Sequence, residues 1–203
     1  LKVAIQSDGV VEIINTKGEE FSLFDEQFLN DVANMKEKNL AIEMLKKLLA
    51  QHIKKHQKKN LTQAELFSEM LDKRLAEYLR GMISNEEVIK ELLEMAKLMK
   101  QHAEEGNALG LSDEEQAFYD ALTRPRAVKD FYENNQLVAM AREITDALRK
   151  NRTLDWRQKE TARAKMRTMI KRLLKKYHYP PEEAQNAIEV VMRQCELWAD
   201  NEE

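Results

Sequence analysis

Residues 155–181 read DWRQKETARAKMRTMIKRLLKKYHYPP, and the spacing of apolar residues in this stretch decides the fold class. Its apolar side chains recur every three or four positions, at Ala162, Met166, Met169, Ile170, Leu173 and Tyr177. This period predicts one amphipathic helix over residues 155–177. Asp155 is expected to cap the helix, and Pro180-Pro181 to end it, because the residue before a proline disfavours helical backbone.

The rest of the sequence favours the same class. Glycine (5) and proline (3) are scarce among the 203 residues, whereas an all-β chain needs many turns. From about residue 25 onward the apolar residues keep the helical period, and Ser112 with Glu115 forms a capping-box pair. Ser84 is expected to begin another helix, with Gly106 beyond its end. We predict an all-α array of about eight or more helices.

Composition divides the chain into three segments. Residues 1–24 differ from the rest, because β-branched residues and an Asp-Gly turn signal favour a short strand pair or a linker from a neighbouring domain. The acidic, glycine-containing stretch 104–112 is the best candidate boundary between two helical subdomains. We therefore predict a first helical subdomain at 25–106 and a second at 107–203, which carries the basic helix.

The net charge of −3 hides a strong separation of charge along the chain. Between Arg149 and Tyr177 lie twelve basic and two acidic residues, a surplus of ten. At about 100° per residue, seven cations project away from the apolar side of the helix or along its flanks: Arg157, Lys165, Arg167, Lys171, Arg172, Lys175 and Lys176. Two interpretations stay open, an ordinary solvated helix surface or a docking surface for nucleic acid or an acidic partner.

Arg163 differs from these cations, since it projects towards the apolar side of the same helix. A charge in that position needs a partner or must extend its head to water. We predict that Arg163 pairs with a carboxylate from a neighbouring helix and serves the structure.

Several kinds of chemistry lack their motifs. The sequence contains no GxxxxGK[ST] phosphate loop, no GxGxxG, and no acid followed two residues later by lysine, a pair that many nucleases use to hold a metal. His52 and His56 have metal-ligand spacing, but the surrounding lysines would repel a cation. Cys195 is the only cysteine, which fits a reducing cytoplasm, and no apolar run reaches membrane-spanning length. We predict no catalytic, cofactor or metal site here and no membrane association.

Four further stretches occur in order before or around the basic helix. They are Lys38-Asn39-Leu40-Ala41, Lys59-Asn60-Leu61, Phe67-Ser68-Glu69-Met70-Leu71 and GLSDEEQAFYDAL at 110–122. Together with residues 155–181, these stretches make the chain resemble the C-terminal region of the restriction (R) subunit of type I restriction–modification enzymes. The motif residues that we expect to serve the structure are Phe118, Tyr119, Asp120, Asp155, Trp156, Arg163, Tyr179, Pro180 and Pro181.

The resemblance implies a function for the parent subunit and another for this region. In that family the restriction subunit couples ATP-driven DNA translocation to DNA cleavage, so ATP and Mg²⁺ would bind upstream of this chain. The C-terminal helical region is associated with docking onto the methyltransferase and specificity subunits. We therefore expect a non-catalytic assembly domain. The alternative is a module that binds the DNA backbone independently of sequence.

Overall fold

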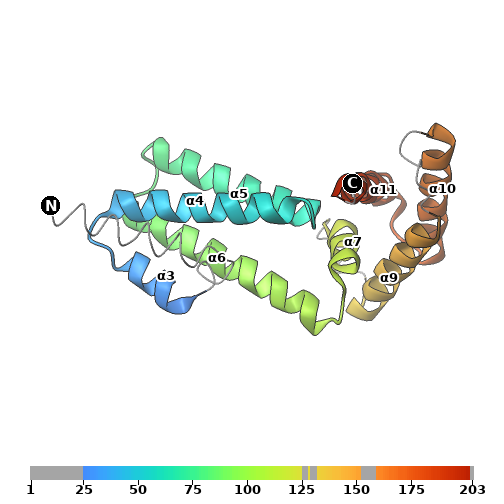
Figure 1. Cartoon of the computed structure of the whole chain (residues 1–203), viewed down its shortest axis with the longest axis horizontal. Helices are drawn as coiled ribbons and strands as arrows, with labels where there is room; N and C mark the ends of the chain where they lie inside the picture. Colours follow the sequence, from blue (N-terminus) through green and yellow to red (C-terminus); the bar gives the residue numbers. More distant parts are fainter. Residues whose placement is uncertain (1–24, 125–127, 129–131, 152–158, 202–203) are drawn as a thin grey trace. The chain divides into compact units, whose positions relative to one another are not determined.

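The computed structural model describes residues 25–124, 128, 132–151 and 159–201. Within these ranges every element of secondary structure is an α-helix, which confirms the predicted all-α class (Figure 1). The eight helices are α3 (Glu26–Ala33), α4 (Lys38–Gln57), α5 (Leu61–Leu79), α6 (Asn85–Ala108), α7 (Asp113–Thr123), α9 (Asn134–Asn151), α10 (Glu160–Lys176) and α11 (Pro181–Asn201). The strand pair predicted near the N-terminus lies outside the described residues.

Contacts group the chain into two compact units. The first comprises residues 1–53 and 67–102, and the second comprises 54–66 and 103–203. The turn between α4 and α5 therefore belongs to the second unit, which the sequence analysis did not anticipate. The subdomain boundary at 106/107 stays a prediction.

The first unit is built from α3, most of α4 and α5, and most of α6. Its core contains mainly aliphatic side chains from helical stripes, including Val32, Leu45, Leu49, Leu71, Val88, Leu92 and Met95. Helix α6 begins as predicted at Ser84, whose Oγ accepts a hydrogen bond from the Glu87 amide at 3.2 Å. The Glu87 carboxylate accepts in return from the Ser84 amide at 2.7 Å, which completes a capping box.

The prediction that Gly106 lies beyond the end of this helix is wrong. Helix α6 continues to Ala108, and Gly110, with φ +63°, takes the left-handed conformation that ends it. Gly106 lies inside the helix and is buried, and a Cβ atom there would meet the end of the Gln116 side chain of α7. A larger residue at this position would make the flexible Gln116 side chain turn away.

The second unit packs α7, α9, α10 and α11 around one core. The largest fully buried side chains of that core are Phe118, Leu122, Leu137, Met140, Ile144, Ile170 and Leu174. Helix α7 begins with the predicted capping box, in which Ser112 and Glu115 satisfy each other's backbone amides. Pro181 is the first residue of α11, a position that proline favours because its fixed φ suits a helix start.

Asn60 attaches the α4–α5 turn to α7. Its side-chain oxygen accepts from the Gln63 amide at 3.1 Å and caps the first turn of α5. Its amide nitrogen donates to Asp120 Oδ2 at 2.6 Å, between two buried side chains. One residue thus caps the first turn of α5 and links the α4–α5 turn to α7 within the second unit.

Gln194 of α11 attaches the same turn from the other side. Its Oε1 accepts from the Leu61 amide at 2.6 Å, and its Nε2 donates to the Lys59 carbonyl at 3.1 Å. Trp198 Nε1 donates to the same carbonyl at 3.2 Å. Gln194 is only 1 % exposed, so its amide group and the backbone groups that it contacts are shielded from water. These hydrogen bonds therefore take the place of bonds to water.

Candidate functional site

Helix α10 carries most of the cations that the sequence analysis singled out, and it starts later than predicted. It begins at Glu160, because Lys159 has extended backbone angles (φ −100°, ψ 107°), and the side chain of Lys159 makes no capping hydrogen bond. The predicted helix start with an Asp155 cap is therefore wrong. Asp155, Trp156 and Arg157 lie outside the described residues.

The end of α10 lies close to the predicted position. The Tyr179 amide donates to the Leu174 carbonyl at 2.9 Å, and the His178 amide donates to the Lys175 carbonyl at 3.1 Å. This pair of bonds is the Schellman arrangement, which requires a left-handed residue. His178 takes that place with φ +57°, where glycine is the usual residue.

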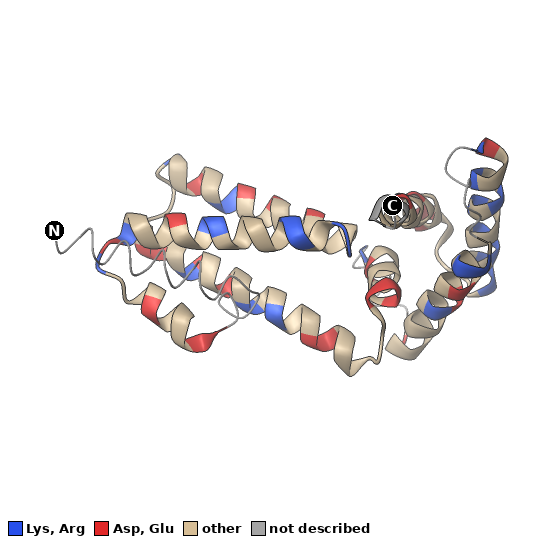
Figure 2. Ribbon diagram, viewed as in Figure 1, with Lys and Arg blue, Asp and Glu red and all other residues tan. Residues whose placement is uncertain are grey.

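The buried side of α10 orients its basic side. Met166, Ile170 and Leu174 are at most 2 % exposed and join the core of the second unit, so the opposite side chains must face solvent. In Figure 2 the ribbon of this helix carries many Lys and Arg positions. Among the described candidates, all six are exposed: Lys165, Arg167, Lys171, Arg172, Lys175 and Lys176.

Four of these cations make no ion pair with any residue that the structure describes. We call them the basic face: Lys165, Lys171, Arg172 and Lys175. Ten residue steps separate the first of them from the last, which is about 15 Å along a helix axis. Thr168, an exposed residue between Lys165 and Lys171, is small, and so is the exposed Ala164 just before Lys165.

The other two candidates are paired inside the unit. Arg167 lies 3.6 Å from the Glu160 carboxylate of its own helix. Lys176 donates to both carboxylate oxygens of Glu143 on α9, at 2.7 and 2.8 Å, and the Tyr177 hydroxyl donates to the same carboxylate at 2.7 Å. Hydrogen bonds from Lys176 and Tyr177 lower the pKa of Glu143, and the bond to Glu143 raises the pKa of Tyr177 to about 12.

Arg163 has the carboxylate partner that the sequence analysis predicted. Its Nη2 lies 2.7 Å from Oε1 of Glu196 on α11. Both side chains keep about a third of their surface exposed (31 % and 33 %), so the pair is only partly buried. The contact is an ion pair without hydrogen-bond alignment, because Oε1 has no hydrogen-bond donor of suitable geometry in the described part.

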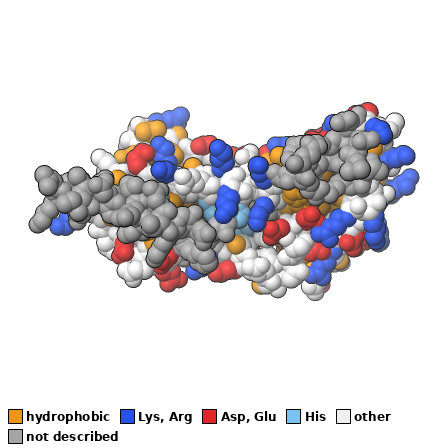
Figure 3. Space-filling view, in the orientation of Figure 1, with side chains coloured by type: hydrophobic (Ala, Val, Ile, Leu, Met, Phe, Trp, Pro, Cys, Tyr) orange, Lys and Arg blue, Asp and Glu red, His pale blue; other side chains and the backbone are white. Residues whose placement is uncertain are grey.

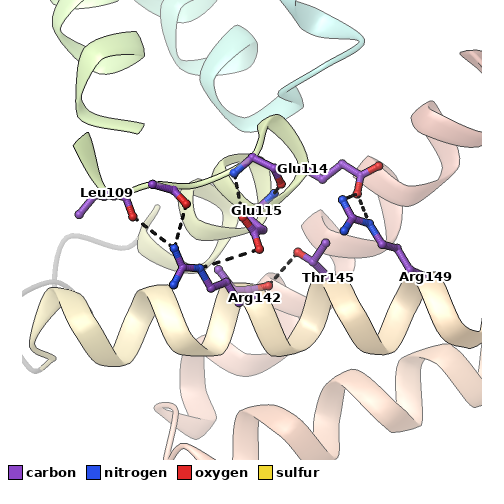
Figure 4. A network of polar contacts seen from close by, with 9 residues as sticks. Leu109, Glu114, Glu115, Arg142, Thr145 and Arg149 are labelled. Atoms are coloured by element: carbon purple, nitrogen blue, oxygen red, sulfur yellow. Dashed lines mark hydrogen bonds and ion pairs between the residues drawn. The ribbon is translucent and has the colours of Figure 1, made fainter. Parts of the chain in front are cut away.

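Arginines of α9 are also engaged, and they hold α7 and the end of α6 (Figure 4). Arg142 donates to the Gly110 carbonyl at 2.8 Å and lies 3.9 Å from Glu115. Arg149 donates through Nε to Glu114 at 2.6 Å. These cations are committed to internal contacts, whereas those of the basic face are available to a partner.

The motif residues of α7 serve the structure. Phe118 is 1 % exposed and packs edge to face against the Trp198 ring, with 4.9 Å between the ring centroids. The Tyr119 hydroxyl donates to Asn134 at 3.3 Å, and Tyr179 donates to the Leu122 carbonyl at 2.7 Å. Sequence reasoning did not find Gln194, although a buried glutamine on the apolar side of α11 was a detectable signal.

Comparison with known proteins gives the family. Residues 1–201 match the family described as "Type I restriction enzyme HindI endonuclease subunit-like, C-terminal". The chain belongs to this family. It is 34% identical over 200 residues to the type I restriction enzyme HindI endonuclease subunit of Haemophilus influenzae, covering 97% of this chain and 19% of that protein. It is 30% identical over 168 residues to a putative type I restriction enzyme MjaIXP endonuclease subunit of Methanocaldococcus jannaschii, covering 82% and 16%.

The chain thus spans less than a fifth of the length of these relatives. No solved structure matches it. Among the residues that the structure describes, no three His, Cys, Asp or Glu side chains gather where they could hold a metal ion. No described helix is long and apolar enough to cross a membrane.

Proposed function

We propose that this chain is a non-catalytic assembly domain that docks a type I restriction endonuclease subunit onto its methyltransferase and specificity subunits. In this proposal the basic face of α10 binds an acidic surface on those subunits. Family membership supports the multi-subunit setting, since the relatives are named as endonuclease subunits of type I restriction enzymes. The observation that carries the proposal is the set of four exposed cations without ion pairs in the described chain.

A structural role does not explain this face. The cations that stabilise the second unit are already paired, as Arg149 is with Glu114 and Lys176 is with Glu143. Neighbouring unpaired cations on one helix repel each other, which costs a few tenths of a kcal/mol per pair. Such a surface has a use when a partner supplies the opposite charge, which also steers association.

A second candidate partner is the DNA backbone, which the same unpaired cations favour. Phosphate contacts need only exposed Lys and Arg, and four of them are present. Helix α10 nevertheless has no amide or aromatic side chain that could read bases or stack on them. A protein surface fits this composition better.

The test reverses the basic face to glutamate in the full-length subunit, at Lys165, Lys171, Arg172 and Lys175. A matched control reverses four exposed lysines of the first unit that pair with no described residue, namely Lys36, Lys47, Lys73 and Lys97. With about 0.5–1 kcal/mol lost per contact, affinity for the purified methyltransferase–specificity complex falls by roughly 30-fold or more. The control variant binds normally. Equal binding by both variants would refute the proposal.

Salt dependence separates the two partners. If the basic face binds DNA phosphates, the wild-type chain binds duplex DNA of random sequence. The logarithm of its binding constant then falls with the logarithm of salt concentration with a slope of about −3.6, since each of four neutralised phosphates contributes roughly −0.9. Docking on protein predicts no such DNA binding. A steep slope, together with normal methyltransferase association in the reversed variant, would favour the DNA-binding function instead.

The catalytic steps belong elsewhere in this proposal. ATP-dependent translocation and DNA cleavage, with ATP and Mg²⁺, are assigned to the part of the cytoplasmic subunit outside this chain, because this sequence lacks a phosphate loop and an acid-x-Lys pair. The purified chain should neither hydrolyse ATP nor nick DNA with Mg²⁺. Turnover that a point substitution within the chain abolishes would overturn this assignment.

A further inference from the structure

The turn between α5 and α6 is closed by backbone and capping hydrogen bonds at both ends. The Gly81 amide donates to the Tyr78 carbonyl at 2.9 Å, and the Met82 amide donates to the Glu77 carbonyl at 3.0 Å. With Gly81 at φ +70°, these two bonds form a Schellman motif. The Ser84 capping box begins α6 two residues later, so both ends of the turn are fixed.

This rigid turn presents two large apolar side chains to solvent. Leu79 is 81 % exposed and Met82 is 67 % exposed, more than any other large hydrophobic residue in the described chain. Hydrophobic side chains are visible at the surface at this end of α5 (Figure 3). In a Schellman motif the residue at the Met82 position commonly packs back onto the helix, but here most of its surface is open.

Rigidity and exposure together are typical of an anchor residue, since a partner that binds a preformed turn loses little conformational entropy. Leu79 and Met82, which we call the tip, form a small surface, and this limits the kind of partner that can bind it. A standard interface between separate proteins takes roughly 20–30 residues a side, which two side chains on one turn do not approach. A covalently linked partner needs far less contact, because its effective concentration is on the order of millimolar.

We propose that the tip formed by Leu79 and Met82 docks into an apolar pocket on the part of the endonuclease subunit that lies outside this chain. The proposal rests on the proposed function in one respect, that the chain is a domain of a longer subunit. The relatives support this, because the match covers 19% and 16% of their lengths. The tip would thus hold the domain on its own subunit, while the basic face of α10 contacts the other subunits.

The test places the photo-crosslinking residue benzoylphenylalanine at Met82 in the full-length subunit, purified without methyltransferase or specificity subunits. A control places it at Leu98 on α6, which is 46 % exposed. Mass spectrometry should find intramolecular cross-links from position 82 to peptides outside this chain, at least about tenfold more abundant than those from position 98. Leu79→Ser added to the position-82 variant should reduce the yield several-fold, because the second anchor is lost.

Three outcomes would overturn the proposal. They are no intramolecular cross-link, equal yields at positions 82 and 98, or cross-links that form only after the methyltransferase–specificity complex is added. Failure of α10 docking is distinguishable, because the cross-links form in the isolated subunit. Reversing the charges of the basic face should leave them unchanged.

Discussion

Gln194→Met tests how the α4–α5 turn is held in the second unit. Methionine keeps the length of the side chain but removes the amide, so the buried Leu61 amide loses its acceptor. An unsatisfied buried donor costs about 1–3 kcal/mol. The Lys59 carbonyl keeps the Trp198 donor, so losing the second bond adds only about 0.5–1.5 kcal/mol. We expect a total loss of roughly 2–4 kcal/mol.

Urea denaturation measures this loss, and native-state hydrogen exchange locates it. The Leu61 amide should exchange faster in the variant, with smaller changes in the middle of α9. Gln194→Glu is a matched control, because its carboxylate can accept from Leu61 but cannot donate to Lys59 and buries a charge at neutral pH. Burial raises the pKa of such a carboxyl, so this control should gain stability as pH falls and the acid is protonated. A Gln194→Met variant within about 0.5 kcal/mol of wild type, with unchanged Leu61 exchange, would refute the reasoning.

Three further predictions concern α10. His178→Gly should stabilise the second unit by about 1 kcal/mol in urea denaturation, because glycine adopts the left-handed φ of +57° without strain; a loss of stability would contradict this. Arg163→Met should cost about 1 kcal/mol and Arg163→Ala more, because Met keeps the packing of the stem while both lose the partly exposed pair with Glu196; equal losses would show that the stem does not pack. The hydrogen bond from Tyr177 to Glu143 should stabilise the folded state at pH values below the ordinary tyrosine pKa of 10.0, and this stabilisation should disappear as pH rises through about 12, the pKa of Tyr177 in the fold. The difference in free energy of unfolding between wild type and Tyr177→Phe should therefore shrink over this pH range. A difference that stays constant would argue against the bond.

Local patterns predicted most of the fold. The helical period predicted α10 and its buried stripe, and the Ser112–Glu115 pair predicted the start of α7, because these features depend on residues within one or two turns. The start of α10 could not be predicted in the same way. Lys159 has extended backbone without a proline, a glycine or a capping side chain to signal it.

Long-range contacts explain what the sequence could not show. Residues 54–66 join the second unit through the bond between Leu61 and Gln194, which are 133 positions apart. The basic face presents the same difficulty. Helical angles predicted which cations point outward. Only the packing of α9 on α10 shows that Glu143 forms an ion pair with Lys176, whereas Lys175 stays exposed and pairs with no residue in the described chain.

Lysine footprinting of the wild-type subunit tests the central claim, docking through the basic face, most directly. Acetylation at Lys165, Lys171 and Lys175 would be quantified by mass spectrometry in the free subunit, with random duplex DNA, and with the methyltransferase–specificity complex, using Lys47 and Lys73 as internal references. The account predicts that the protein complex slows labelling of the three α10 lysines several-fold, while DNA alone and the reference lysines show no change. Labelling of the α10 lysines that stays as fast in the assembled complex as in the free subunit, or that DNA alone slows, would contradict it.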